Sequence, residues 1–181
     1  EILSGLVGSE MCIRDSLEGE NILGIVLTHA HEDHIGALGW LWPRIQAPLY
    51  ATPFTAFLIR EKLRDAGIYE DVELHEAPLG STVNLGPFEV TYVTITHSIA
   101  EPNGLAIKTP LGTVLHTGDW KIDNDPVVGE RTDVDFIQKL GDEGVLAMVC
   151  DSTNVFVDGV AGSEGAVSYT HLRAHETRED L

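Results

Sequence analysis

Cysteine is scarce in this sequence of 181 residues, which contains only Cys12 and Cys150. Two cysteines cannot form the set of disulfide bonds that holds small secreted domains together. A chain of this length is able to bury a hydrophobic core of its own instead. We therefore expect a globular protein of a reducing compartment, with the cytoplasm as the default location.

Long apolar runs are also missing. No uninterrupted hydrophobic stretch reaches the roughly 20 residues that a helix needs to cross a bilayer. The first 16 residues, EILSGLVGSEMCIRDS, have neither the basic start nor the apolar centre of a signal peptide. We expect no membrane association.

Basic residues are few, with 11 lysines and arginines against 29 aspartates and glutamates and a formal net charge of −18. Such a charge argues against a protein that coats nucleic acid through electrostatic attraction alone. It leaves room for an enzyme that meets nucleic acid in a local basic channel. Bound divalent cations would offset part of the negative field around their own ligands.

Both ends of the sequence differ in character from its middle. Residues 1–16 and 168–181 contain LVGSEMCIRDS and SYTHLRAHETRE, which are similar to translated sequencing-library adapter. We interpret both segments as non-native, and residues 17–167 as one domain that is cut at both ends. His171 and His175 have the i, i+4 spacing of a helical zinc site, but under this interpretation they lie in a non-native segment.

Hydrophobic patterning in the middle of the chain predicts several strands. Continuous apolar runs indicate strands buried on both faces at 22–28 and 145–150. Alternating residues indicate half-exposed strands at 71–77 and 88–96. Three shorter strands are expected, the last two as a hairpin, at 47–51, 104–109 and 113–117.

Helices are predicted between these strands. A short helix within residues 29–43 is expected to end at Pro43, because proline disrupts a helix interior. A longer helix covers residues 53–67, with Thr52 as its N-cap and a glycine as its stop. One side of this helix is expected to carry Phe54, Phe57, Leu58 and Leu63. With a third helix at 133–144, the pattern indicates a layered α/β domain.

Polar clusters follow four of the predicted strands. They are THAHEDH (28–34), His97 with Ser98, Asp119 in the sequence TGD, and DSTN (151–154). Loops at one edge of a rigid sheet are where active sites are built. The four clusters together therefore predict one functional site.

The residue types in these clusters predict a metal centre. His29 and His31 are two residues apart and can point to one side of an extended loop, whereas Asp33 and His34 can point to a second position. Imidazole and carboxylate ligands suit zinc, manganese or iron. Where two ions lie about 3.5–4 Å apart, a shared carboxylate is the natural bridge between them. Asp119 is the best candidate for that bridge.

The clusters also carry a family resemblance. HAHEDH (29–34) matches the HxHxDH signature of the metallo-β-lactamase superfamily. THSIAEPNGLAIKTPLGTVLHTGDWKID (96–123) and CDSTNVF (150–156) resemble the ribonuclease J group of the β-CASP nucleases within that superfamily. The similarity covers nearly all of residues 22–167. It implies an α/β fold, the four-layer αββα sandwich with a dinuclear site at one edge, here incomplete at both ends.

The resemblance implies a role for each residue of the site. One metal would be held by His29, His31 and His97. The second would be held by Asp33 and His34, with Asp119 as the bridge. Asp151 matches an acidic residue that lies beside the metals and helps proton transfer to the leaving group. The residues expected to take part in catalysis are therefore Asp33, Asp119 and Asp151.

The implied activity is hydrolysis of RNA phosphodiester bonds, by 5′-3′ exonuclease and endonuclease cleavage, in RNA turnover and rRNA maturation. Two divalent ions, zinc in the first place and manganese in the second, would lower the pKa of a shared water molecule. They would also stabilise the charge on the attacked phosphate. The resemblance further implies a homo-oligomeric parent protein. It places a β-CASP domain and a final histidine ligand of the second metal beyond residue 167.

Other interpretations remain open at this stage. A small-molecule hydrolase of the same superfamily, such as a thioesterase or lactonase, would use the same histidines. The chain could also be a fragment that binds metal without turnover, since missing strands would leave open sheet edges. Asp151 suits a turn at the end of its strand as well as a catalytic role. Trp40 and Trp42 suit packing against the sheet better than stacking on bases.

Overall fold

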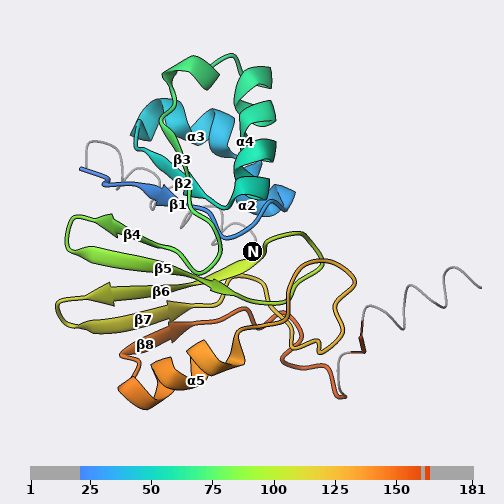
Figure 1. Ribbon diagram of the computed structural model, residues 1–181. Coiled ribbons are helices and arrows are strands. Elements are labelled where there is room, and N and C mark those ends of the chain that lie inside the picture. The colour runs from blue at the N-terminus through green and yellow to red at the C-terminus, as the bar shows by residue number, and fades with distance from the viewer. Residues whose placement is uncertain (1–20, 160–161, 164–181) are drawn as a thin grey trace, which may run out of the picture.

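The computed structural model describes residues 21–159 and 162–163 (Figure 1). The segments 1–16 and 168–181, which include Cys12, His171 and His175, lie outside the described residues. In the part of the chain that the structure describes, no helix has the length and apolar character of a membrane span.

A three-stranded parallel sheet forms the first half of the molecule. Its strands, in spatial order, are β1 (Ile25–Val26), β2 (Leu49–Ala51) and β3 (Leu74–Glu76). Parallel neighbours need a crossover connection, which is usually helical. The connections here contain α2 (Glu32–Ile35), α3 (Leu38–Ile45), α4 (Pro53–Asp65) and a short 3₁₀ helix (Tyr69–Asp71).

A five-stranded sheet forms the second half. It begins as an antiparallel meander of β4 (Thr82–Leu85), β5 (Phe88–Thr94), β6 (Asn103–Thr109) and β7 (Gly112–His116). After α5 (Val134–Glu143), β8 (Ala147–Val149) returns and pairs in parallel with β7. The predicted hairpin of residues 104–117 is confirmed as β6 and β7.

Alternation along the strands builds the layers. In β2, Leu49 packs with Ile59 of α4 in one hydrophobic cluster, whereas Tyr50 points to the opposite side and packs with Tyr92 of the second sheet. In β5 the next residue, Val93, faces away from the first sheet and packs with Leu140 of α5. Since neighbouring residues of a strand point to opposite faces, each sheet has one face toward helices and one toward the other sheet.

The resulting order is helices, sheet, sheet, helix, with α3 and α4 outside the first sheet and α5 outside the second (Figure 1). The predicted α/β class and αββα sandwich are thus confirmed. Each fully buried aliphatic or aromatic side chain of these clusters contributes about 1.5–3 kcal/mol to folding.

Two details of the helix predictions were wrong. Pro43 lies inside α3, which continues to Ile45 and ends at Gln46 in the left-handed conformation (φ 53°). In so short a helix, Pro43 removes a single intrahelical hydrogen bond. In α4, Phe57 is 57% exposed, and the buried face consists of Thr55, Ala56, Ile59 and Leu63. Those four positions recur with the helical period, whereas Phe57 lies to one side of them.

The two strands predicted to be buried on both faces are exposed or short. β1 has only two half-buried residues, and all three residues of β8 are exposed, with Met148 at 61%. Both strands lie at a sheet edge, and the α5 cluster covers Val93, Ala106 and Leu115 rather than β8. β4 was not predicted at all; it pairs with β5 across a tight turn at Gly86 (φ 59°).

The two tryptophans of α3 have different surroundings. Trp42 is buried and its indole N–H donates to the Ala47 carbonyl (2.8 Å). Trp40 is 86% exposed, so the expected packing against the sheet is wrong for this residue.

Candidate metal centre

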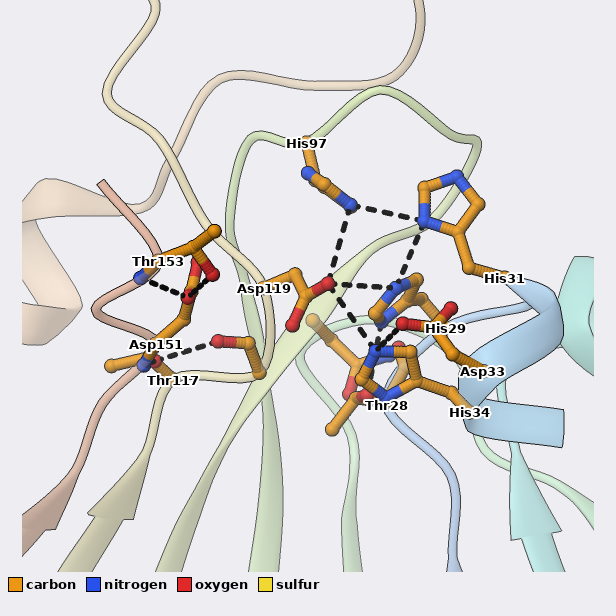
Figure 2. Close-up of polar contacts among 12 residues, drawn as sticks. Thr28, His29, His31, Asp33, His34, His97, Thr117, Asp119, Asp151 and Thr153 are labelled. Carbon is orange, nitrogen blue, oxygen red and sulfur yellow. Dashed lines mark hydrogen bonds and ion pairs between the residues drawn. The ribbon is translucent and has the colours of Figure 1, made fainter. Parts of the chain in front are cut away.

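Six of the residues selected from the sequence meet at one edge of the sandwich (Figure 2). Four of them follow β1, in the loop and first turn of α2; His97 follows β5, and Asp119 follows β7. They form two groups whose possible ligand atoms lie within 4.8 Å of one another. The first group is His29, His31, His97 and Asp119, and the second is Asp33, His34 and Asp119.

The first group has the spacing of ligands to a single ion. His31 Nδ1 lies 3.2 Å from His29 Nε2 and 3.1 Å from His97 Nε2. Two imidazole nitrogens bound to one tetrahedral zinc at their usual bond lengths would lie about 3.3 Å apart. These three histidines, from two distant parts of the chain, therefore fit a divalent cation.

The second group shares one carboxylate oxygen with the first. Asp119 Oδ2 lies 3.2 Å from His34 Nε2, and 3.8 Å from both His29 Nε2 and His97 Nε2. His34 Nε2 lies 3.6 Å from Asp33 Oδ2. A carboxylate with one group on either side has the position of a bridge between two ions.

His29 is the most buried of these histidines, with an exposed fraction of 1%. Burial, followed by the neighbouring imidazoles of His34 and His97, lowers the pKa of His29 to about 4. The ring is therefore neutral at pH 7, as a metal ligand must be. Thr28 Oγ1 lies 3.0 Å from His29 Nδ1 and orients the ring, with the donor set by the tautomer.

Asp151 belongs to neither group. Its Oδ1 accepts hydrogen bonds from the Thr153 backbone N–H (2.9 Å) and hydroxyl (2.6 Å), and these bonds lower the pKa of the Asp151 carboxyl. Its own N–H donates to Thr117 Oγ1 (3.2 Å). These contacts form the turn that was one of the two interpretations of DSTN, and a catalytic role for Asp151 stays a prediction.

Sequence reasoning did not select the residues that support the ligands. Thr96 and Thr132 are joined by three hydrogen bonds of 2.9–3.1 Å, which hold the strand end just before His97. A signal was present, because threonine directly precedes both His29 and His97. In two of the three bonds, each threonine hydroxyl accepts from the backbone N–H of the other threonine.

Fold and site together define the class: an αββα protein with a histidine–aspartate cluster suited to divalent metal ions. The sequence model of the family described as the Metallo-beta-lactamase superfamily matches residues 4–142. The chain belongs to the metallo-β-lactamase superfamily.

Curated relatives narrow the similarity further. The chain is 49% identical to Ribonuclease J of Sinorhizobium meliloti over 148 residues, which are 82% of the chain and 26% of that protein. It is 45% identical to Ribonuclease J of Corynebacterium glutamicum over 150 residues, which are 82% of the chain and 21% of that protein. It is 36% identical to Ribonuclease J2 of Bacillus subtilis over 149 residues, which are 82% of the chain and 27% of that protein. The chain thus spans about a quarter of the length of these relatives.

Solved structures agree with the fold. A protein of unknown function from Enterococcus faecalis superposes with a TM-score of 0.57 at 17% identity, covering 78% of this chain and 34% of that one. Zn²⁺-bound PqqB from Methylobacterium extorquens gives a TM-score of 0.50 at 18% identity, covering 72% of this chain and 42% of that one. At these identities the similarity concerns the fold alone.

Proposed function

We propose that the chain is the metal-binding part of a ribonuclease of the ribonuclease J type, which hydrolyses RNA phosphodiester bonds. The observation that carries this proposal is the position of Asp119 Oδ2 between two ligand groups, in a chain 36–49% identical to proteins named as ribonucleases. The proposal includes a cytoplasmic, homo-oligomeric parent, 5′-3′ exonuclease and endonuclease cleavage, and a place in RNA turnover and rRNA maturation. These finer features rest on the family resemblance.

We propose two divalent ions, with zinc as the first choice and manganese as the second, because the ligands are nitrogen and oxygen atoms without a thiolate. The first ion would take His29, His31 and His97, and the second Asp33 and His34, with Asp119 serving both. When bound, such ions supply Lewis acidity and lower the pKa of a coordinated water molecule.

The residues of the chain prepare this site in three ways. The neutral ring of His29, buried and oriented by Thr28, presents a lone pair at pH 7. Asp119 places one carboxylate oxygen toward both groups. Asp33, with a side chain 77% exposed, lies at the open side of the cluster. Since the chain is strongly acidic, the charge of the ions is also needed to attract a phosphate.

The test is Asp119→Ala in the full-length parent protein, assayed on a 5′-monophosphorylated RNA oligomer. Loss of a group that only hydrogen-bonds a metal ligand costs about 10–100-fold in metal affinity or activity, so loss of the ligand itself should lower cleavage at least about 100-fold. Asp142→Ala, an exposed aspartate of α5, is the matched control and should cleave normally. Unchanged RNA cleavage by Asp119→Ala would overturn the proposal.

The same proteins separate the other functions. A small-molecule hydrolase would cleave a lactone or thioester faster than RNA and would lose that activity with Asp119→Ala. A chain that binds metal without turnover would bind zinc through Asp119 and cleave none of these substrates.

A further inference from the structure

The loop between β5 and β6 carries His97 and also contains strained backbone. Glu101 has a φ of 51°, the left-handed conformation that side chains other than asparagine and aspartate seldom adopt. Such a conformation persists only where the surrounding contacts enforce it. The contacts of Glu101, and of Asn103 two residues later, therefore show what holds this loop in place.

Glu101 binds the start of a helix that lies far away in the sequence. Its Oε2 accepts a hydrogen bond of 2.8 Å from the backbone N–H of Phe54, the second residue of α4. The first N–H groups of a helix have no partner within the helix, and a carboxylate there is also favoured by the helix dipole. Thr52 holds the N-cap position without capping, because its hydroxyl donates to Thr55 Oγ1 instead (3.1 Å). Glu101 thus replaces a local cap and joins the His97 loop to α4.

Asn103, the first residue of β6, makes the second attachment at the point where this loop ends. It is fully buried, and its side-chain amide donates to the carbonyl of Thr28, the residue before His29. Its backbone N–H approaches the same carbonyl (3.3 Å), and its amide also reaches the Glu101 carbonyl (3.4 Å). The chain segment that presents His97 is therefore attached directly to the one that presents His29.

We propose that Glu101 and Asn103 are positioning residues, which hold His97 against His29 and His31 before any metal ion binds. Neither side chain belongs to a ligand group. Glu101 fixes the loop to the start of α4, and Asn103 fixes the end of the loop to Thr28, which lies between β1 and His29. The 3.1 Å distance between His97 Nε2 and His31 Nδ1 depends on both attachments. This inference rests on the metal centre of the proposed function, and it does not depend on RNA as the substrate.

The test measures zinc affinity of the whole 181-residue chain by competition with a chromophoric chelator, and records the visible spectrum of the cobalt(II) form. Glu101→Ala should weaken zinc binding about 10–100-fold, the range for losing a contact that orients metal ligands, and change the cobalt spectrum. Glu101→Gln should bind nearly as tightly as the unaltered chain, because the amide oxygen can accept the same N–H of Phe54.

Two further variants separate positioning from general stability. Leu63→Ala removes a fully buried side chain from the same helix, away from the cap, and should leave zinc affinity and the cobalt spectrum unchanged. Glu101→Gly removes the carboxylate and also relieves the left-handed strain. Its zinc affinity should remain below that of the unaltered chain, because the bond to Phe54 is lost. Asn103→Ala should also weaken zinc binding, and it provides the test if Glu101→Ala does not fold.

The outcomes are distinguishable. Unaltered zinc affinity and spectrum in Glu101→Gly and Asn103→Ala would overturn the positioning role while leaving the metal centre intact. An unaltered chain that binds no zinc would overturn the metal centre itself, and this inference with it. Zinc binding without RNA cleavage in the parent would overturn only the proposed activity.

Discussion

Tyr92 is fully buried between the two sheets, and its hydroxyl has no hydrogen-bond partner among the described residues. Burial, with a smaller contribution from Tyr50, raises the pKa of the Tyr92 hydroxyl above its ordinary value near 10. The unfolded chain therefore loses this proton at a lower pH than the folded chain. Its contribution to stability is complete below pH 10 and is lost as the pH rises further.

Tyr92→Phe tests this account. Replacing an unpaired buried hydroxyl by hydrogen should leave the free energy of unfolding unchanged or raise it by up to about 1 kcal/mol. The decline of stability above pH 10 should also become shallower. Urea denaturation of both proteins between pH 7 and 11 measures the two effects. A loss of more than about 1 kcal/mol at pH 7 would mean that the hydroxyl has a partner after all.

Gly118 and Gly67 form a matched pair for a second test at this scale. Both have positive φ, 59° and 71°, but a Cβ on Gly118 would lie 3.0 Å from the Asn103 carbonyl oxygen, whereas a Cβ on Gly67 would meet no other described residue within 4 Å. Alanine at either position costs about 1–2 kcal/mol for the left-handed backbone. Gly118→Ala should lose more than Gly67→Ala in urea denaturation, and it alone should weaken zinc binding, because it displaces the adjacent Asp119. Equal losses would show that the neighbours of Gly118 yield freely.

Among the elements, α4 packs on the three-stranded sheet, and its buried face can be tested directly. Leu63 is fully buried and Phe57 is 57% exposed, although the sequence pattern placed both on the apolar side. Leu63→Ala should lower the free energy of unfolding by about 2–5 kcal/mol. Phe57→Ala should change it by less than about 1 kcal/mol, as for other surface substitutions. Thermal or urea denaturation of the two variants shows which residue lies on the buried face of α4. A larger loss of stability for Phe57→Ala than for Leu63→Ala would mean that Phe57 is the buried one.

The elements also show what the sequence could predict. The limits of α4 follow from local chemistry, since Pro53 suits its first turn and Gly67 (φ 71°) follows its end. The six proposed ligands could be selected because each lies in a polar cluster directly after a strand. Strands that run in the same direction, such as β5 and β7 on either side of β6, end at the same edge of a sheet. The structure places all six within two groups.

What the sequence could not supply is the position of each strand within its sheet. The apolar residues of β8 indicated burial, but its edge position leaves Met148 exposed. Burial depends on which elements lie beside a strand, and that is not encoded in the strand itself. The support from Glu101 was hidden for the same reason, because its partner Phe54 is 47 positions away in the sequence.

For the molecule as a whole, the candidate metal centre joins the two halves of the sandwich. Four of the proposed ligands follow the first strand of the three-stranded sheet, and two follow strands of the five-stranded sheet (Figures 1 and 2). The four are His29, His31, Asp33 and His34, and the two are His97 and Asp119. An ion bound by ligands of both sheets would bind the folded chain far better than the unfolded one. Metal binding should therefore stabilise the entire fold and not only the loops around it.

Zinc should accordingly raise the free energy of unfolding of the 181-residue chain, by about 2.7 kcal/mol when free zinc is 100 times its dissociation constant. A chelator should remove this gain. His97→Ala deletes the histidine that the second sheet contributes and should lose most of the gain, because the ion would then be held mainly by one half. His75→Ala changes a histidine of β3 that lies outside both ligand groups, and it should keep the full gain. Thermal denaturation with and without zinc measures all three proteins, and an equal zinc-induced rise in His97→Ala would show that the ion does not link the two sheets.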